Sequence, residues 1–209
     1  KTCGNGSSEF MSNVAFSLVG MLYNAQLMKY AGENGIAAYG VLMYVSMIFN
    51  AIFIGYSVGT APIVSYHYGA DNKPELKGLL KKSVIITSVV AVFMLASGEL
   101  LAYPLSGIFV GYDAELLEMT GHAFRIYSLA FLLCGFSIYG SSFFTALGNG
   151  LISALIAFLR TLLFQVAAVI ILPILWELDG IWWSIVVAEV MSVIVTSAFL
   201  LFNRKKYGY

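Results

Sequence analysis

The chain has 209 residues, of which 60% are hydrophobic and only 11% are charged, and its formal net charge at pH 7 is zero. Soluble domains contain roughly one quarter charged residues, so this composition excludes an ordinary water-soluble protein. The neutral total also gives no indication of a nucleic-acid partner.

The length sets how many times the chain can cross a membrane. A helix needs about 20 apolar residues to span roughly 30 Å of hydrocarbon, which leaves room for about six or seven spans and no soluble domain. Breaks fall where Gly, Pro, Asn and charged residues cluster. We predict an all-α membrane protein whose six transmembrane helices cover approximately residues 10–28, 36–67, 83–110, 120–147, 151–175 and 180–202.

Local signals in chain order support these elements. The first span follows Ser7, a candidate N-cap, and has Glu9 in its first turn. The second is longer than a bilayer requires and should be kinked or tilted around Pro62. Leucines and lysines mix over residues 74–82, which predicts a short interfacial helix that begins at Pro74.

The charged residues test this segmentation, because cytoplasmic loops of membrane proteins are rich in Lys and Arg. Counted on alternate sides, one face holds Lys1, Lys73, Lys77, Lys81, Lys82, Arg204, Lys205 and Lys206, and the other holds Glu33, Asp113, Glu115, Glu118, Glu177 and Asp179. Only Lys29 and Arg125 go against this trend. We therefore expect a multi-pass protein of the inner (cytoplasmic) membrane, with both ends of this chain in the cytoplasm. Because the chain starts at Lys1 rather than Met, we interpret it as a piece of a longer polypeptide.

Enzyme motifs are absent from the sequence. It has no phosphate-binding Gly-x-x-x-x-Gly-Lys-Ser/Thr loop, no His-Glu-x-x-His and no paired-cysteine metal pattern. A membrane-embedded enzyme would need acidic, His or Cys groups clustered at one membrane face. We assign no catalytic residue, metal or organic cofactor, and a purely structural membrane subunit remains an alternative.

Ionisable residues within the predicted spans are the first candidates for function. Such residues cost roughly 2.5 to 3.5 kcal/mol on insertion scales and usually face a cavity or a partner. Arg160 and Glu189 lie near the middle of consecutive antiparallel spans and could pair, although their depths differ by about 10 Å at 1.5 Å per residue. Either a polar cavity wall with an ion relay or a structural ion pair fits both residues. Glu9 is a third candidate, or a carboxylate stabilised by the helix N-terminus.

Aromatic side chains on the spans form a second set of candidates. Tyr39, Tyr139 and Phe136 belong to this set, and most such rings simply face lipid or a neighbouring helix. Rings that line a shared cavity would suit bulky apolar cations through cation–π contacts and adaptable packing. They are therefore weak candidates for a substrate cavity.

Several stretches together resemble the C-terminal half of the multidrug and toxic compound extrusion (MATE) family. The matching stretches are Gly55, Ser65-Tyr66-His67-Tyr68-Gly69-Ala70, residues 143–150 (FFTALGNG), Leu159-Arg160, Ile171-Leu172-Pro173 and residues 178–184 (LDGIWWS). The order and spacing of these stretches, rather than any one of them, make the match specific. They cover nearly the whole chain.

The resemblance implies one six-helix lobe, helices seven to twelve, of a transporter with twelve helices in two lobes. The partner would be the N-terminal six-helix lobe of the same parent chain, and the substrates small organic cations and other drugs. The implied function is secondary active multidrug efflux by antiport with Na⁺ or H⁺, through alternating access.

The sequence also departs from the family. Members with a cation site in this lobe use carboxylates on helices seven and ten, where a rough alignment places Phe16 and Phe136. The acidic residue that some members use for proton coupling lies on helix one, outside this chain, so the coupling ion stays open. The alternative within the superfamily is a flippase for lipid-linked saccharides, which would need several basic cavity residues to hold a pyrophosphate. Only Arg160 qualifies.

Overall fold

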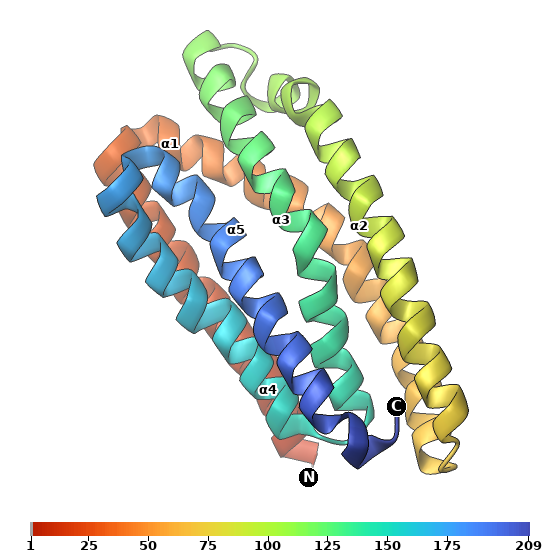
Figure 1. Ribbon diagram of the computed structural model, residues 1–209. Coiled ribbons are helices and arrows are strands. Elements are labelled where there is room, and N and C mark those ends of the chain that lie inside the picture. The colour runs from red at the N-terminus through yellow and green to blue at the C-terminus, as the bar shows by residue number, and fades with distance from the viewer. Residues whose placement is uncertain (1) are drawn as a thin grey trace.

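The chain forms an all-helical bundle in the computed structural model, which describes the backbone of residues 2–209 and the side chains from Val14 onward (Figure 1). The elements are α1 (Thr2–Gly69), α2 (Lys73–Val110), α3 (Ala114–Ala146), α4 (Gly150–Phe158), the π-helix η1 (Leu159–Phe164) and α5 (Gln165–Tyr207). α4, η1 and α5 follow one another without a loop. Glu9 lies on α1 before the described side chains, so the structure leaves its role a prediction.

Four helical segments among the described residues are long and apolar enough to cross a membrane. They are Val14–Gly69, Lys73–Val110, Ala114–Ala146 and Gly150–Tyr207. This count differs from the six predicted from sequence, because residues 29–35 and 176–179 were expected to be loops and instead continue as helix around short breaks. The composition predicted correctly where the helices are interrupted, but not that each interruption is only one or two residues long.

Two further boundaries differ from the sequence-based expectation. Residues 74–82 are not a separate interfacial helix, because α2 runs unbroken from Lys73, with Asn72 as N-cap and Pro74 in its first turn. α3 begins at Ala114, inside the acidic stretch, because the Asp113 side chain accepts hydrogen bonds from two backbone amides of the first turn. Both helices are consequently longer than a bilayer requires.

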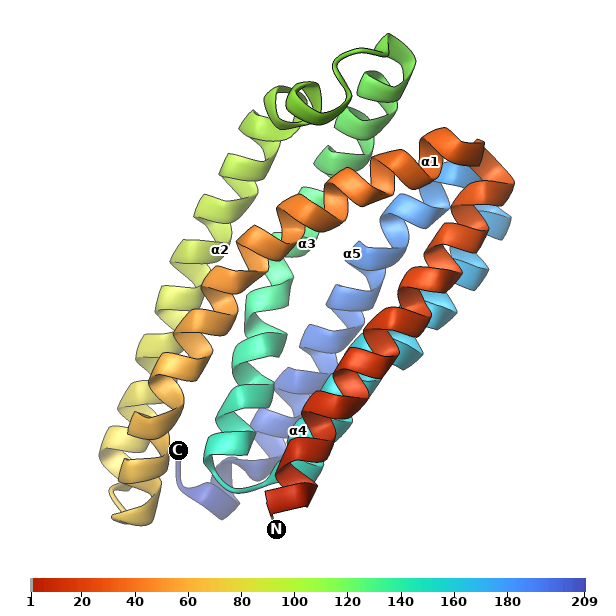
Figure 2. The ribbon, with the colours of Figure 1, turned by 180° about the vertical axis from the view of Figure 1, so that it is seen from behind.

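The first and last segments each turn back on themselves. A straight helix of 56 residues, the length of Val14–Gly69, would measure about 84 Å, nearly three times the hydrocarbon thickness. Figures 1 and 2 show that α1 rises from the N-terminus, bends at the far end of the bundle and returns, and that α4–η1–α5 does the same. The non-helical residues are Gly32 in α1, and Trp176 and Glu177 in α5.

Both bends depend on one residue with a positive φ and a strongly negative ψ. Gly32 has φ 62° and ψ −148°, and Glu177 has φ 49° and ψ −126°. Glycine adopts this region freely, whereas a residue with a Cβ is strained there by about 1–3 kcal/mol. The second bend therefore carries strain that the first avoids.

This strain leads to a stability prediction. We expect Glu177→Gly to raise the free energy of unfolding by about 1 kcal/mol, because the relief of strain exceeds the added chain entropy of glycine. Unfolding in mixed micelles measures the change. The control is Lys81→Gly, on an exposed and regular part of α2, which should lower stability by about 1 kcal/mol. A loss at both positions would show that Glu177 is unstrained.

α3 is the central helix, and α1, α2 and α5 all pack against it. Glycines permit this close approach, since a Cβ at Gly135 would collide with Phe53 of α1 and one at Gly140 with Thr196 of α5. The turns α1–α2 and α3–α4 and both chain ends lie at one end of the bundle, and the bends and the α2–α3 turn lie at the other. The lysine-rich segments therefore share one end, which we call the basic end.

Candidate functional site

A buried ion pair joins the two parts of the last helical segment, the one before and the one after the bend at Trp176 and Glu177. Arg160 Nε lies 2.9 and 3.1 Å from the two carboxylate oxygens of Glu189, and Arg160 Nη2 lies 2.7 Å from Oε1. The Glu189 side chain is only 3% exposed and that of Arg160 21%. The sequence-based expectation that these residues could pair is confirmed. A role of this pair in transport remains a prediction.

The two charged residues lie at similar distances from the bend, and therefore at similar depths in the bundle. Arg160 precedes the break at Trp176 by sixteen residues and Glu189 follows Glu177 by twelve, a difference of four residues or about 6 Å along the helix axis. The long arginine side chain covers this offset. Arg160 lies in η1, and π-helical turns inside α-helices occur frequently at functional sites. The sequence carried no signal for η1.

A pair of tyrosines on α1 contacts α5 five residues before Glu189. The Tyr23 hydroxyl is 2.6 Å from Ser184 Oγ on α5, and the Tyr23 ring stacks on Tyr39 with centroids 5.1 Å apart. Tyr127 and Cys134 of α3 are buried in the same hydrophobic core as Tyr23 and Tyr39. Tyr39, a predicted substrate-cavity residue, is thus buried in this core. From the sequence, Tyr23 was one of many aromatic residues on the spans and Ser184 only part of the family-like stretch 178–184, so neither was a site candidate.

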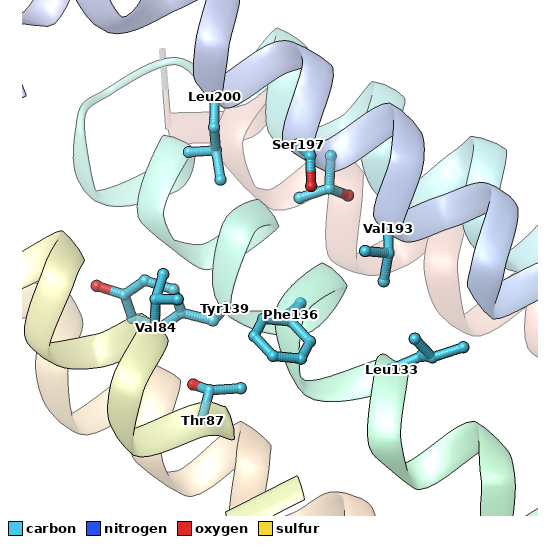
Figure 3. Close-up of a pocket in the computed structure, with 9 residues that line it drawn as sticks. Val84, Thr87, Leu133, Phe136, Tyr139, Val193, Ser197 and Leu200 are labelled. Carbon is cyan, nitrogen blue, oxygen red and sulfur yellow. The ribbon is translucent and has the colours of Figure 1, made fainter. Parts of the chain in front are cut away.

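The other two predicted aromatics lie elsewhere, on a cavity of about 310 Å³ between α2, α3 and α5. Figure 3 shows Phe136 and Tyr139 of α3 on its floor, with α2 on one side and α5 on the other. The complete lining is Val84, Thr87, Leu133, Phe136, Tyr139, Val193, Thr196, Ser197 and Leu200. None of these side chains is charged. The sequence pattern gave no means of finding the α2 and α5 walls, which depend on how the helices pack.

A third polar contact stands at the end of the bundle opposite the basic end. His122 Nε2 lies 3.0 Å from Asp179 Oδ1, which ties the first part of α3 to α5 just beyond its bend. Both side chains are about half exposed. Exposed pairs of this kind contribute little to stability, about 0–1 kcal/mol, so the contact is a local tie rather than a site. No group of three or more His, Cys, Asp or Glu side chains among the described residues could hold a metal ion.

Comparison with known proteins agrees with this architecture. The MatE family matches residues 10–171, more than three quarters of the chain. The chain belongs to the MATE family. Multidrug export protein MepA of Staphylococcus aureus is 22% identical over 201 residues, a match that covers 96% of this chain and 44% of MepA. MepA of Staphylococcus saprophyticus is 23% identical over 209 residues, with the same coverage.

Solved structures share the fold of this MATE chain. A multidrug resistance MATE family transporter of the MOP superfamily in an outward-facing conformation superposes with a TM-score of 0.87 at 22% identity, over 97% of this chain and 45% of that one. A Vibrio cholerae MATE transporter gives 0.89 at 13% identity, over 97% and 46%. The chain spans about half the length of its relatives, so it forms one lobe of an all-α membrane transporter fold.

Proposed function

We propose that this chain is the C-terminal half, helices seven to twelve, of a multidrug efflux transporter that exchanges Na⁺ or H⁺ for drugs. The names of its MATE relatives support drug export, and its length supports a partner lobe that completes the transporter. Organic cations and other drugs would bind between the two lobes. Apart from the coupling ion, no cofactor takes part.

The two long bent segments each cross the membrane twice in this proposal, which makes six spans. Each bend then stands at one membrane surface, and the two basic clusters that the structure describes, residues 73–82 and 204–206, stand at the other. Lys29 and Arg125 are the exceptions, on the side of the bends. The positive-inside rule assigns the basic end to the cytoplasm. Both ends of the chain are therefore cytoplasmic, and the membrane is the inner one.

This topology predicts a labelling pattern for single cysteines in a background without other reactive thiols. Tyr112, 82% exposed in the α2–α3 turn, and Lys205, near the end of α5, stand at opposite ends of the bundle. A membrane-impermeant maleimide should label the Tyr112→Cys variant in intact cells and the Lys205→Cys variant only after permeabilisation. Labelling of Lys205→Cys in intact cells would reverse the orientation.

The proposal of ion coupling rests on the buried Arg160–Glu189 pair. Glu189 is buried and paired with a single arginine, so it can release Arg160 when it binds H⁺ or Na⁺. An exposed carboxylate would bind these ions without changing the contacts inside the lobe. Ser184, five residues before Glu189 on α5, is hydrogen-bonded to Tyr23, and hydroxyl oxygens of this kind can pass a proton or ligate a cation. We infer that Glu189 takes part in the relay.

The flippase alternative fits the geometry less well. A pyrophosphate carrier needs unpaired basic side chains in its cavity, and Arg160 already makes three hydrogen bonds to Glu189. The cavity of about 310 Å³ has no charged lining at all. Neither site in the described part of the chain is therefore suited to hold a pyrophosphate.

Dye efflux and drug susceptibility in cells that express the complete transporter test the proposed function. We expect energised cells to export a cationic dye, and expect cells with the gene to tolerate several unrelated drugs better than cells with an empty vector. Separately imposed Na⁺ and H⁺ gradients identify the coupling ion. If no gradient drives export of any cationic drug, the efflux assignment fails, and a lipid-flipping assay becomes the next step.

A further inference from the structure

The cavity between α2, α3 and α5 is unsuited to an organic cation. Its lining is uncharged, so only two rings, Phe136 and Tyr139, could attract a positive group. The basic end of the bundle lies just beyond it and would repel such a group. A different kind of occupant has to be considered.

The cavity exists because α2 and α5 both pack on α3 and hardly touch each other. Its walls reach the outside of the bundle, since Val84 is 40% exposed and Ser197 is also exposed. At about 310 Å³ it has roughly twice the volume of an engineered apolar cavity of 150 Å³ that binds benzene. The apolar molecules that surround a membrane-spanning helix are acyl chains, and one can enter from the bilayer.

One polar group in the wall points to an occupant that is not purely hydrocarbon. Thr196 is 2% exposed, and its hydroxyl oxygen has no hydrogen-bond partner among the described residues. A buried hydroxyl without a partner costs free energy that a ligand carbonyl or hydroxyl would recover. The glycerol ester region of a lipid supplies such groups next to its acyl chain.

Basic side chains continue the cavity walls toward the membrane surface. On α2, Lys81 and Lys77 precede Val84 by three and seven positions and so share its helix face. On α5, Arg204 follows Leu200 by four positions and likewise extends that wall. All three side chains are exposed. They stand where the headgroup of a lipid would lie if its chain occupied the cavity.

Neighbouring carboxylates do not cancel this charge. Seven basic residues of the basic end are described, namely Lys73, Lys77, Lys81, Lys82, Arg204, Lys205 and Lys206. The two acidic residues of the α1–α2 turn and the start of α2, Asp71 and Glu75, pair with Lys73 and Lys82 at 3.4 Å. Lys77 and Lys81 make no ion pair in the described structure. Charge complementarity therefore favours an anionic headgroup.

We propose that the cavity between α2, α3 and α5 binds one anionic phospholipid, with an acyl chain against Phe136 and the headgroup phosphate on Lys77, Lys81 and Arg204. The aromatic cluster around Tyr207 and Tyr209 holds the end of α5 in place, and the Lys73 side chain packs against Gly208. This packing keeps the basic residues of α2 and α5 on two sides of one opening. The proposal is independent of the drug-export assignment.

Photocrosslinking of the complete transporter in phosphatidylcholine nanodiscs tests the lipid site. The probes are phosphatidylglycerol and phosphatidylcholine, each with a diazirine in the acyl chain, at low mole fraction. Phosphatidylglycerol should crosslink Phe136 and Val193 far more than phosphatidylcholine does. Ile194, the lipid-facing neighbour of Val193 and 58% exposed, should react equally with both probes and serves as the control for folding.

The combined variant Lys77→Gln, Lys81→Gln and Arg204→Gln should lose roughly a hundredfold in phosphatidylglycerol affinity at the cavity, because each basic residue near the surface is worth about 1 kcal/mol. Its crosslinking at Ile194 should not change. Equal cavity crosslinking by both lipids in the unmodified protein would overturn the proposal. So would protection of Phe136 by tetraphenylphosphonium without any preference for phosphatidylglycerol, which would instead assign the cavity to cationic drugs.

Discussion

Glu189→Gln is expected to abolish drug export and to lower the free energy of unfolding by about 3–5 kcal/mol. The substitution leaves Arg160 charged, largely buried and without its counter-ion, and breaking one side of a buried pair is costly for this reason. Dye efflux at matched expression measures the first effect, and unfolding in mixed micelles the second. Glu75→Gln is the matched control, because Glu75 pairs with Lys82 on the surface and its loss should change stability by less than about 1 kcal/mol.

A second variant separates a relay from a structural pair. Replacing both residues, with Arg160→Met and Glu189→Met together, removes the unpaired charge, so stability should return to near that of the unmodified protein. Export should nevertheless stay absent, since no carboxylate is left to exchange partners. Normal export by this double variant would show that the pair only holds η1 and α5 together.

Gly180→Val is expected to prevent correct folding of the last helical segment, at a cost of about 3 kcal/mol or more. Gly180 lies three residues after Glu177, and a Cβ there would collide with the backbone carbonyl of Leu172 on the opposite side of the bend. Overpacking against side chains costs about 1–3 kcal/mol because they can move, and a backbone carbonyl inside a tight bend has less freedom. The yield of folded protein and its thermal midpoint measure the effect.

The matched control for this substitution is Gly107→Ala on α2, where a Cβ meets nothing within 4 Å. Alanine there should raise stability by up to about 1 kcal/mol through helix propensity. If Gly180→Val is as stable as Gly107→Ala, the close contact between Gly180 and Leu172 across the bend is incorrect.

Much of the fold was predictable from composition and charge. Hydrophobic length predicted a helical membrane protein, and the alternation of lysine-rich and acid-rich segments matches the two ends of the bundle. The bend at Gly32 coincides with a glycine that adopts its backbone angles without strain. The bend at Glu177 has no such marker, because a non-glycine residue adopts a positive φ there under tertiary constraint.

The candidate site was predictable only in part. Arg160 and Glu189 stood out because charge inside an apolar span is rare, and the structure pairs them. Their depths could not be obtained from span midpoints, since η1 and the bend shift the register. Tyr39, Phe136 and Tyr139 formed one set in the sequence, but the structure divides them between the stacked tyrosines of α1 and the cavity. How the helices pack decides which ring lies in which place, and the periodicity of a single sequence does not predict that packing.

Transport by the purified complete protein in liposomes is the most direct test of ion-coupled antiport through the buried Arg160–Glu189 pair. An imposed H⁺ or Na⁺ gradient should drive uphill movement of a cationic dye, and dye movement should in turn move the same ion in the opposite direction. The Glu189→Gln variant should do neither. Dye movement that proceeds equally with no gradient, or that persists in the Glu189→Gln variant at the normal rate, would contradict ion-coupled antiport through the buried pair.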